Sequence, residues 1–540
     1  MATSKADTMF KEFKEHSVAE FFKKNRQMLG YSSLGRSLVT VVHEYVTNSL
    51  DACEEAEILP DITVAITKVD EKRYKVRVQD NGPGIPKAYI GKALATILAG
   101  TKFHRYIQQR GQQGIGAGGC ALFSRVTTGK PIHAISSTGN SAFSCDVSIE
   151  TVHNKPIVTN QEQIEKPGFK GLSVEGEFAD TKYEMGEHSV YEYLRRTALT
   201  NPHAQIKLID PDGKEYLFAR AAENLPPKPQ ATKPHPLGLT VNDLLEFAHH
   251  SESRKISSFL IETFARTTQG KVAELKEVLR DVDLDKDPKE MSWSDAEKMI
   301  EAFKQIKWIA PEAIAIIPVG EKQIEVALRN ILNPEHMSVV ERKPKVFRGG
   351  VPFVVEAAVA FGGNSGRKDE NGETGYAGNI LRFANKVPLL FDSGNCAITA
   401  AVRDIQWRRY NIDLDSQPIS IMVNVSSVHI PYSGVGKESI AQEAEIIEEV
   451  KLAVMDAARG IQRYIANKER IHHEANRYNT IMRYTKQLSS DIADLTGESE
   501  EKVEKKLTKL VAEHFPKATE EEEAEEGPGE TKEDAEEEEE

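Results

Sequence analysis

Apolar or small side chains recur at helical spacing early in the chain, at Leu38, Val41, Val42, Tyr45, Val46 and Ser49. This periodicity predicts an amphipathic helix that places Glu44, Asn48 and Asp51 together on its opposite side. A carboxylate and an amide one turn apart suit nucleotide hydrolysis, because Glu44 can take a proton from water and Asn48 can offer its oxygen to Mg²⁺. A solvated helix face shows the same pattern, so the helix alone leaves both interpretations open.

An alternating pattern follows at residues 74–79, where Tyr, Val and Val alternate with Lys, Arg and Gln. It predicts a half-buried strand that leads Asp80 into the glycine-containing turn 80–84. A carboxylate at this position can accept a hydrogen bond from an adenine amino group. Asp-Asn-Gly is also an ordinary hairpin signal, so the turn alone does not decide between the two.

Five glycines then precede an apolar run at residues 120–123, namely Gly111, Gly114, Gly116, Gly118 and Gly119. They predict a loop that leads into a helix N-terminus, where backbone N–H groups and the helix dipole can hold phosphates. Taken alone, a glycine-rich segment of this kind also fits a flexible turn that binds no phosphate.

The rest of the chain indicates further domains. Residues 224–229 are proline-rich and predict an extended linker, and residues 235–305 alternate helical runs with short turns. Strand-like runs return at 352–356 and 419–425. A long helix with a narrow apolar seam is predicted from the spacing of Ile447, Val450, Val454, Ala457, Ile461 and Tyr464.

Composition narrows the possible partners and compartment. The formal charge is −14, but residues 520–540 hold 14 acidic residues and one lysine, so the rest of the chain carries only −1. We expect this tail to be disordered, because it has too few apolar groups to offset the entropy of ordering. The four cysteines show neither a zinc spacing nor a disulfide framework, which favours a reducing cytoplasm. Neither a signal pattern nor a membrane-length apolar run occurs, so we expect no membrane partner.

In their order and spacing, the helix, the turn and the glycine-rich loop resemble the GHKL ATPases, which include gyrase, the ninety-kilodalton heat-shock chaperone, histidine kinases and MutL proteins. The resemblance implies a Bergerat α/β sandwich that binds ATP under a mobile lid. It further implies that Glu44 is the general base, Asn48 the Mg²⁺ ligand and Asp80 the adenine reader, while Gly82 and Gly84 shape the turn beneath the base.

The same resemblance implies phosphate contacts. Thr101 and Lys102 are similar to the pair at the lid edge, and residues 171–174 are similar to the last box of the family. The implied lid consists of Gly111, Gln112, Gln113, Gly114, Ile115, Gly116, Ala117 and Gly118.

Three later segments, residues 342–346, 381–392 and 406–410, carry a more specific resemblance, to the B subunits of archaeal DNA topoisomerase VI. This resemblance implies a multidomain α+β chain with a long C-terminal stalk helix. The implied parts are an N-terminal strap (1–30), a GHKL ATPase domain (31–228), a helix-two-turn-helix domain (229–306), a transducer domain (307–470), a C-terminal helical region (471–516) and a disordered acidic tail (517–540).

It also implies roles for residues outside the ATPase domain. Lys437 matches the transducer lysine that contacts the γ-phosphate, although its segment is not a Walker A loop, since Glu438 replaces the required Ser or Thr. Trp407, Arg408 and Tyr410 are similar to a DNA-contacting motif, with arginine in place of lysine. The alternative for the two aromatic residues is a place in the core beside a strand.

Together the resemblances imply an ATP-gated clamp. Two B subunits are expected to dimerise over double-stranded DNA when ATP binds, and A subunits of an A2B2 heterotetramer to cut and rejoin both strands, which relaxes supercoils and decatenates DNA. The implied cofactors are ATP and Mg²⁺, and the implied location is the archaeal cytoplasm, at the nucleoid. A clamp of the MutL or chaperone type without DNA cleavage is the alternative, because the ATP site alone fits both.

Overall fold

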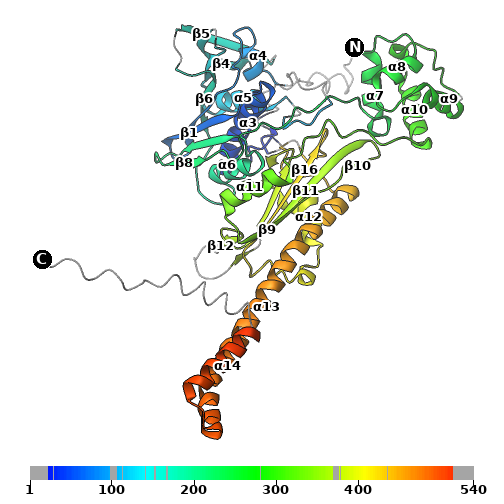
Figure 1. Ribbon diagram of the computed structural model, residues 1–540. Coiled ribbons are helices and arrows are strands. Elements are labelled where there is room, and N and C mark those ends of the chain that lie inside the picture. Colours follow the sequence, from blue (N-terminus) through cyan, green and yellow to red (C-terminus); the bar gives the residue numbers. More distant parts are fainter. Residues whose placement is uncertain are drawn as a thin grey trace, which may run out of the picture. The chain divides into compact units, whose positions relative to one another are not determined.

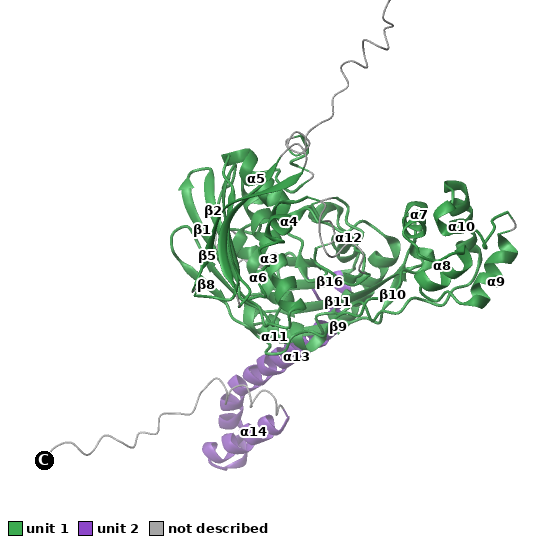
Figure 2. Ribbon diagram, turned by 90° about the horizontal axis from the view of Figure 1, so that it is seen from above, with its two compact units in different colours: residues 1–406, 414–457 green, residues 407–413, 458–540 purple. Residues whose placement is uncertain are grey.

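The computed structural model describes residues 22, 24–27, 29–97, 106–111, 114–139, 141–150, 154–165, 168–279, 281–368, 376–377, 379–434 and 436–514. The chain divides into two compact units, residues 1–406 with 414–457 and residues 407–413 with 458–540 (Figure 2). Most of the predicted strap and all of the predicted acidic tail lie outside the described residues.

An eight-stranded sheet, in the order β5-β4-β3-β6-β2-β1-β7-β8, forms the N-terminal part of the first unit. Its strands are β1 (Asp61–Asp70), β2 (Arg73–Asp80), β3 (Ile132–Ser137), β4 (Ala142–Glu150), β5 (Lys155–Ile164), β6 (Gly171–Ala179), β7 (Gln205–Ile209) and β8 (Glu215–Phe218). Neighbouring strands are antiparallel except β1 and β7, which are parallel.

Four helices lie along one face of this sheet (Figure 2): α3 (Leu34–Glu55), α4 (Ile90–Ala95), α5 (Gly116–Thr128) and α6 (Val190–Thr200). Strand β2 has the predicted alternation, with Tyr74, Val76 and Val78 buried against these helices. The layers of helix and sheet form the predicted α/β sandwich, and its core lies between them.

A helical part follows the extended segment 219–235 (Figure 1). It contains α7 (Val241–His249), α8 (Ile256–Thr263), α9 (Gln269–Val278) and α10 (Trp293–Gln305), as the turn-separated runs at 235–305 predicted. Capping boxes at Thr240/Asp243 and Ser292/Asp295 start α7 and α10. These helices share a separate hydrophobic core.

A second sheet has the order β10-β11-β16-β14-β15, and β9 pairs with β11. Its strands are β9 (His336–Glu341), β10 (Lys345–Phe347), β11 (Val351–Phe361), β14 (Asn379–Ala384), β15 (Val387–Pro388) and β16 (Ile419–Ser427), and β12 (Arg367–Lys368) pairs with β13 (Tyr376–Ala377) outside it. The strand-like runs at 352–356 and 419–425 therefore lie in β11 and β16. The helices of this part are α11 (Glu321–Leu332) and α12 (Ala397–Arg403). Leu199 of α6 shares a hydrophobic cluster with Leu328 of α11, so the two sheets belong to one packed unit.

The C-terminal helices are α13 (Ala444–Thr496) and α14 (Glu500–His514) (Figure 1). The predicted seam of α13 is partly correct, because Val450, Val454, Ala457 and Ile461 are buried whereas Ile447 and Tyr464 are only half-buried. Further apolar residues are buried in the same part of α13, among them Ile446, Ala453, Ala458 and Ile465. The apolar stripe is therefore wider than the narrow seam predicted.

The four cysteines, Cys53, Cys120, Cys145 and Cys396, are all free and buried. Burial raises the pKa of the Cys53 thiol to about 12. Across the described ranges, no helix combines the length and the apolar character that crossing a membrane requires.

Candidate functional site

Helix α3 carries the predicted catalytic face. It begins after Ser33, whose hydroxyl oxygen accepts a hydrogen bond from the Arg36 N–H at 3.4 Å. Its buried side consists of Ser37, Leu38, Val39, Val41, Val42, Tyr45, Val46, Thr47, Ser49, Leu50 and Cys53, which include all the predicted core positions. Glu44 and Asp51 are half-buried and Asn48 is exposed, as their spacing predicted.

A cavity of about 560 Å³ lies against α3, a volume within the usual range of ligand pockets. Thr40, Glu44 and Asn48 line it from the helix at intervals of four residues. Other predicted site residues that line it are Asp80, Gly84, Gly111, Gly114, Ile115, Gly116, Ala117, Gly118 and Lys437. The fold thus brings the separate sequence motifs to one cavity.

Asp80 lines the cavity from the end of β2 and is only 5% exposed. Its carboxylate accepts hydrogen bonds from Ser49 Oγ at 2.8 Å, the Gly82 N–H at 3.0 Å and the Leu172 N–H at 3.1 Å. Burial raises the pKa of Asp80, and these three hydrogen bonds oppose the rise. Contacts from α3, the turn and β6 therefore hold this carboxylate in one orientation.

Glycine is required around Asp80 because the backbone is crowded there. Gly84 has φ +71°, and a Cβ at that position would lie 2.5 Å from Ser137 O. Gly171 has φ +126°, and its Cβ would lie 2.1 Å from Asp80 O, while a Cβ on Gly82 would lie 3.0 Å from Asp80 Oδ1. The predicted turn and the segment 171–174 therefore meet at Asp80.

The glycine-rich segment leads into α5, which begins at Gly116 rather than just before the apolar run at residue 120. A Cβ on Gly116 would lie 1.9 Å from Glu44 Oε2, and a Cβ on Gly118 would lie 2.8 Å from Thr96 O. These glycines let the first turn of α5, with its free N–H groups, approach α3 and the cavity.

Four of the predicted phosphate-contacting residues, Thr101, Lys102, Gln112 and Gln113, lie outside the described residues.

A loop that follows β16 brings Lys437 to the cavity. The bridge between Tyr432 and Ile440 closes the base of this loop, and the Ser433 N–H donates to Ser439 O at 2.9 Å. Lys437 has φ +53° and lines the cavity with its neighbours Gly436 and Glu438. A lysine from the loop after β16 therefore lines the same cavity as Glu44 of α3.

Arg36 joins this loop to α3 and was not among the predicted site residues. Its Nε donates to Glu438 Oε1 at 2.6 Å, and its Nη2 lies 3.3 Å from Asp392 Oδ2. Its guanidinium lies over the ring of Phe391, 4.9 Å from the centroid. Spacing could have indicated this residue, because it precedes Thr40, Glu44 and Asn48 at the same interval of four.

His43 and Tyr193 also line the cavity without having been predicted. His43 Nδ1 lies 3.2 Å from the hydroxyl of Tyr193. Burial lowers the pKa of His43, the charge of Glu44 opposes this shift and the charge of Lys437 adds to it. The structure therefore favours a neutral imidazole beside Glu44.

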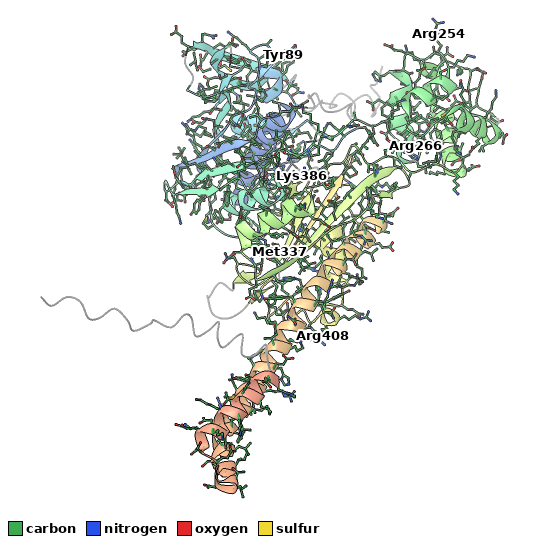
Figure 3. All side chains as sticks on the ribbon, viewed as in Figure 1. Tyr89, Arg254, Arg266, Met337, Lys386 and Arg408 are labelled. Atoms are coloured by element: carbon green, nitrogen blue, oxygen red, sulfur yellow. The ribbon has the colours of Figure 1, made fainter. Side chains whose placement is uncertain are left out.

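Asp51, grouped by spacing with Glu44 and Asn48, takes part in a different cluster. Arg110, the residue before the glycine-rich segment, contacts Asp51 at 2.7 Å, Glu54 at 2.6 Å and Asn201 Oδ1 at 2.5 Å. Lys386, whose charge also acts on Glu54, is buried where the first sheet's helices meet the second sheet (Figure 3). We call Asp51, Glu54, Arg110, Asn201, His203 and Lys386 the junction cluster.

Hydrogen bonds connect the junction cluster to both sheets. Asn385 and Lys386 form the turn between β14 and β15, both at positive φ, as in a type I′ hairpin. Asn385 Nδ2 donates to Gln109 O at 2.9 Å, and Lys386 O accepts from Thr200 Oγ1 at 2.7 Å. The Gln108 N–H donates to Ala315 O at 2.9 Å. Residues 108 and 109 are thereby hydrogen-bonded to the β14–β15 turn and to the segment before α11.

Opposite charges within the junction cluster offset the effect of burial on its ionisable groups. Burial alone would raise the pKa of Glu54, but the charge of Arg110 and hydrogen bonds from His203 and Arg110 hold it well below its usual value. Burial lowers the pKa of Lys386, and the charge of Glu54 opposes that shift. The ionised form of Glu54 therefore depends chiefly on Arg110.

Trp407, Arg408 and Tyr410 lie in a short 3-10 helix, Trp407–Tyr410, which belongs to the second unit. Arg408 is exposed and lies beside α13 (Figure 3), whereas Trp407 is half-buried and Tyr410 is buried. The cavity does not include these residues.

Two family models match the chain. The model described as "Histidine kinase-, DNA gyrase B-, and HSP90-like ATPase" matches residues 34–151. The model described as "Topoisomerase VI B subunit, transducer" matches residues 311–477. The first match contains α3 and the glycine-rich segment, and the second contains Lys437.

Relatives of known function resemble the chain over most of its length. The B subunit of type 2 DNA topoisomerase 6 from Pyrococcus horikoshii is 42% identical over 554 aligned residues, covering 94% of this chain and 96% of that protein. Its namesake from Thermococcus sibiricus is 41% identical, covering 97% and 100%. A third, from Methanothermobacter thermautotrophicus, is 44% identical, covering 88% and 91%.

Proposed function

The chain belongs to the family of type 2 DNA topoisomerase 6 B subunits, and from this membership we propose that it is the ATP-binding and ATP-hydrolysing subunit of a type II DNA topoisomerase. One observation carries the proposal: a single cavity is lined by Glu44 and Asp80 from the ATPase region and by Lys437 from the transducer region. A nucleotide in this cavity touches both regions, so the presence of its γ-phosphate can bias the arrangement of the transducer.

Hydrolysis uses groups from three elements. Glu44 of α3 is the general base that takes a proton from the attacking water. Lys437 places an ammonium where negative charge develops on the transferred phosphoryl group. The N–H groups of the first turn of α5, at Gly116, bind phosphate oxygens.

The donor set around Asn48 fits Mg²⁺. The ion prefers oxygen ligands and usually takes one or two from the protein, with the rest from phosphates and water. Asn48 is exposed to the cavity and offers one amide oxygen, one turn from the Glu44 carboxylate. Bound Mg²⁺ supplies charge neutralisation at the phosphates, and Asn48 holds it.

Asp80 recognises the base: its buried carboxylate accepts a hydrogen bond from the adenine amino group, while Gly82 and Gly84 put no Cβ against Asp80 Oδ1 or Ser137 O. Thr101, Lys102, Gln112 and Gln113 supply further phosphate contacts.

At the level of the assembly, ATP binding dimerises two B subunits over double-stranded DNA, with A subunits completing an A2B2 heterotetramer. Residues 31–228 act as the ATPase domain, 229–306 as the helix-two-turn-helix domain and 307–470 as the transducer. In the segment of Trp407, Arg408 and Tyr410, the DNA contact comes from the exposed guanidinium of Arg408, while the buried Tyr410 anchors the short helix that carries it. The complex works in the cytoplasm, at the nucleoid.

Plasmid relaxation by the chain mixed with its cognate A subunit tests this function. We expect relaxation that requires ATP and Mg²⁺ and that is lost in the Glu44→Ala variant. If the chain hydrolyses ATP and dimerises but never supports relaxation, it acts instead as a MutL-type or chaperone-type clamp.

A further inference from the structure

Arg36 lies at a position where its own helix disfavours a positive charge. It lies in the first turn of α3, where the helix dipole is positive, and this turn contains no acidic residue. Its side chain is 16% exposed, so water screens the charge poorly. The compensating carboxylates come from outside α3, at Glu438 and Asp392.

The contact with Glu438 fixes the orientation of the Arg36 guanidinium as well as compensating its charge. Arg36 Nε donates to Glu438 Oε1 at 2.6 Å, and Nη2 contacts the other carboxylate oxygen, so the two planar groups meet at two points. The Glu438 side chain is 12% exposed. Phe391 covers the guanidinium and itself stacks on His188, with ring centroids 5.2 Å apart. Lysine could replace the charge of Arg36 but not this geometry.

Lys437 precedes Glu438 and depends on it for position. Its φ of +53° is a left-handed conformation, which a residue other than glycine keeps only when its surroundings hold it. Gly434 and Gly436 precede Lys437 and give the loop many alternative conformations. The Tyr432–Ile440 bridge fixes the base of the loop, and the Arg36–Glu438 contact fixes its tip against α3.

We propose that Arg36 is a positioning residue for ATP hydrolysis. It binds the Glu438 carboxylate and thereby places the Lys437 ammonium next to the same γ-phosphate that faces Glu44. Arg36 and Glu44 are two turns apart on one helix, about 12 Å along its axis, so a rigid element sets the spacing between the general base and the lysine loop. The inference rests on the function proposed above, since it presumes that the cavity binds ATP.

Affinities for ADP and for a non-hydrolysable ATP analogue, measured with steady-state ATPase rates, test the role of Arg36. In Arg36→Met, we expect kcat to fall about ten- to hundredfold, because Lys437 is misplaced by about 1 Å or more. Affinity for the ATP analogue should fall by a similar factor, whereas affinity for ADP should change less than about threefold, because ADP has no γ-phosphate. A general loosening of the cavity would weaken both nucleotides.

Further variants separate positioning from folding. Glu438→Gln should lower kcat and the affinity for the ATP analogue as Arg36→Met does. In Arg36→Lys, both quantities should lie between those of Arg36→Met and wild type. The double variant Arg36→Met/Lys437→Ala should have a kcat no more than about twofold below that of Lys437→Ala alone, since both substitutions act through one lysine. The control is Arg73→Met, which removes an arginine paired with Asp70 and Glu177 at 3.4 Å, outside the cavity lining, and should behave as wild type.

The proposal is overturned if Arg36→Met and Glu438→Gln retain the wild-type preference for the ATP analogue over ADP, or if ADP affinity falls in the same proportion. Failure of the proposed function looks different, because wild-type protein would then bind neither nucleotide or would hydrolyse ATP equally well with Glu44→Ala. The ratio of the affinity for the ATP analogue to the affinity for ADP decides the role of Arg36 even if turnover is slow.

Discussion

Glu44 and Gly116 show how tightly single residues constrain the cavity. A Cβ on Gly116 would lie 1.9 Å from Glu44 Oε2, so no side chain fits between α3 and the first turn of α5. The helical spacing of α3 predicted that Glu44 faces away from the core, but not what it faces. That neighbour is far away in sequence and could be found only from the fold.

Glu44→Ala should bind ATP and dimerise but hydrolyse it about 10²- to 10⁴-fold more slowly, because it lacks only the group that activates water. Single-turnover hydrolysis and nucleotide-dependent size-exclusion chromatography measure the two properties. Normal turnover in this variant would remove Glu44 as the base.

Gly116→Ala should lower ATP turnover while leaving the fold intact, because the added methyl must displace the Glu44 carboxylate or the start of α5. Gly119→Ala is the matched control, since a Cβ there would approach no atom closer than Tyr31 Oη at 3.7 Å. Alanine also favours the helix by up to about 1 kcal/mol. Equal ATPase rates in the two variants would contradict the importance of this close approach.

At the scale of elements, periodicity was a reliable guide where one face of an element is buried. Strands β11 and β16 are buried at nearly every position and were found instead from continuous strand-like apolar runs. Periodicity identified α3 and β2, because burial of alternate or helically spaced positions leaves a direct trace in the sequence. It misjudged the start of α5, where glycines that signal a loop form the first helical turn instead. Backbone approach, not side-chain chemistry, explains those glycines.

The junction cluster had no sequence signature at all. Arg110, Asp51 and Lys386 come from three distant segments, and each alone reads as an ordinary surface charge. Their burial follows from two sheets packing together, which no local pattern records. The attachment of residues 108–110 to this cluster and to the β14–β15 turn could therefore not have been predicted.

Arg110→Met should destabilise the first unit by about 3–5 kcal/mol, because Asp51 and Glu54 would stay buried without their cation. Denaturant unfolding measures the change. Lys75→Met is the control: it removes an ion pair of 2.8 Å between half-exposed side chains, which should cost less than about 1 kcal/mol. Similar costs for the two variants would show that the junction cluster is not a stabilising element.

For the molecule as a whole, helix α3 is attached near both of its ends to the part of the chain that contains the second sheet. Arg36 pairs with Glu438 near its start, and Asp51 and Glu54 join the junction cluster near its end. Glu44 and Asn48 lie between these two attachments. A displacement of the transducer therefore acts directly on α3, which carries Glu44 and Asn48.

This architecture predicts acid sensitivity. The pKa of Glu54 is lower in the folded protein than its ordinary value of 4.5, so its stabilising contribution is complete above that pH and is lost as the pH falls through the folded pKa. Glu54→Gln lacks the contribution at every pH. The difference in unfolding free energy between wild type and Glu54→Gln should thus be largest near neutral pH and shrink below about pH 4.5. A difference that does not change with pH would contradict the assignment.

The burial of Cys53, Cys120, Cys145 and Cys396 makes the motions of this protein directly observable. None of the native thiols competes for a maleimide dye, so one cysteine introduced at an exposed position should label selectively without removal of the others. Placing that cysteine at Leu217 of β8, which is 60% exposed and outside the cavity lining, puts a fluorophore on the ATPase region of each protomer. Energy transfer between two such protomers would then test the proposed ATP-driven dimerisation, one molecule at a time.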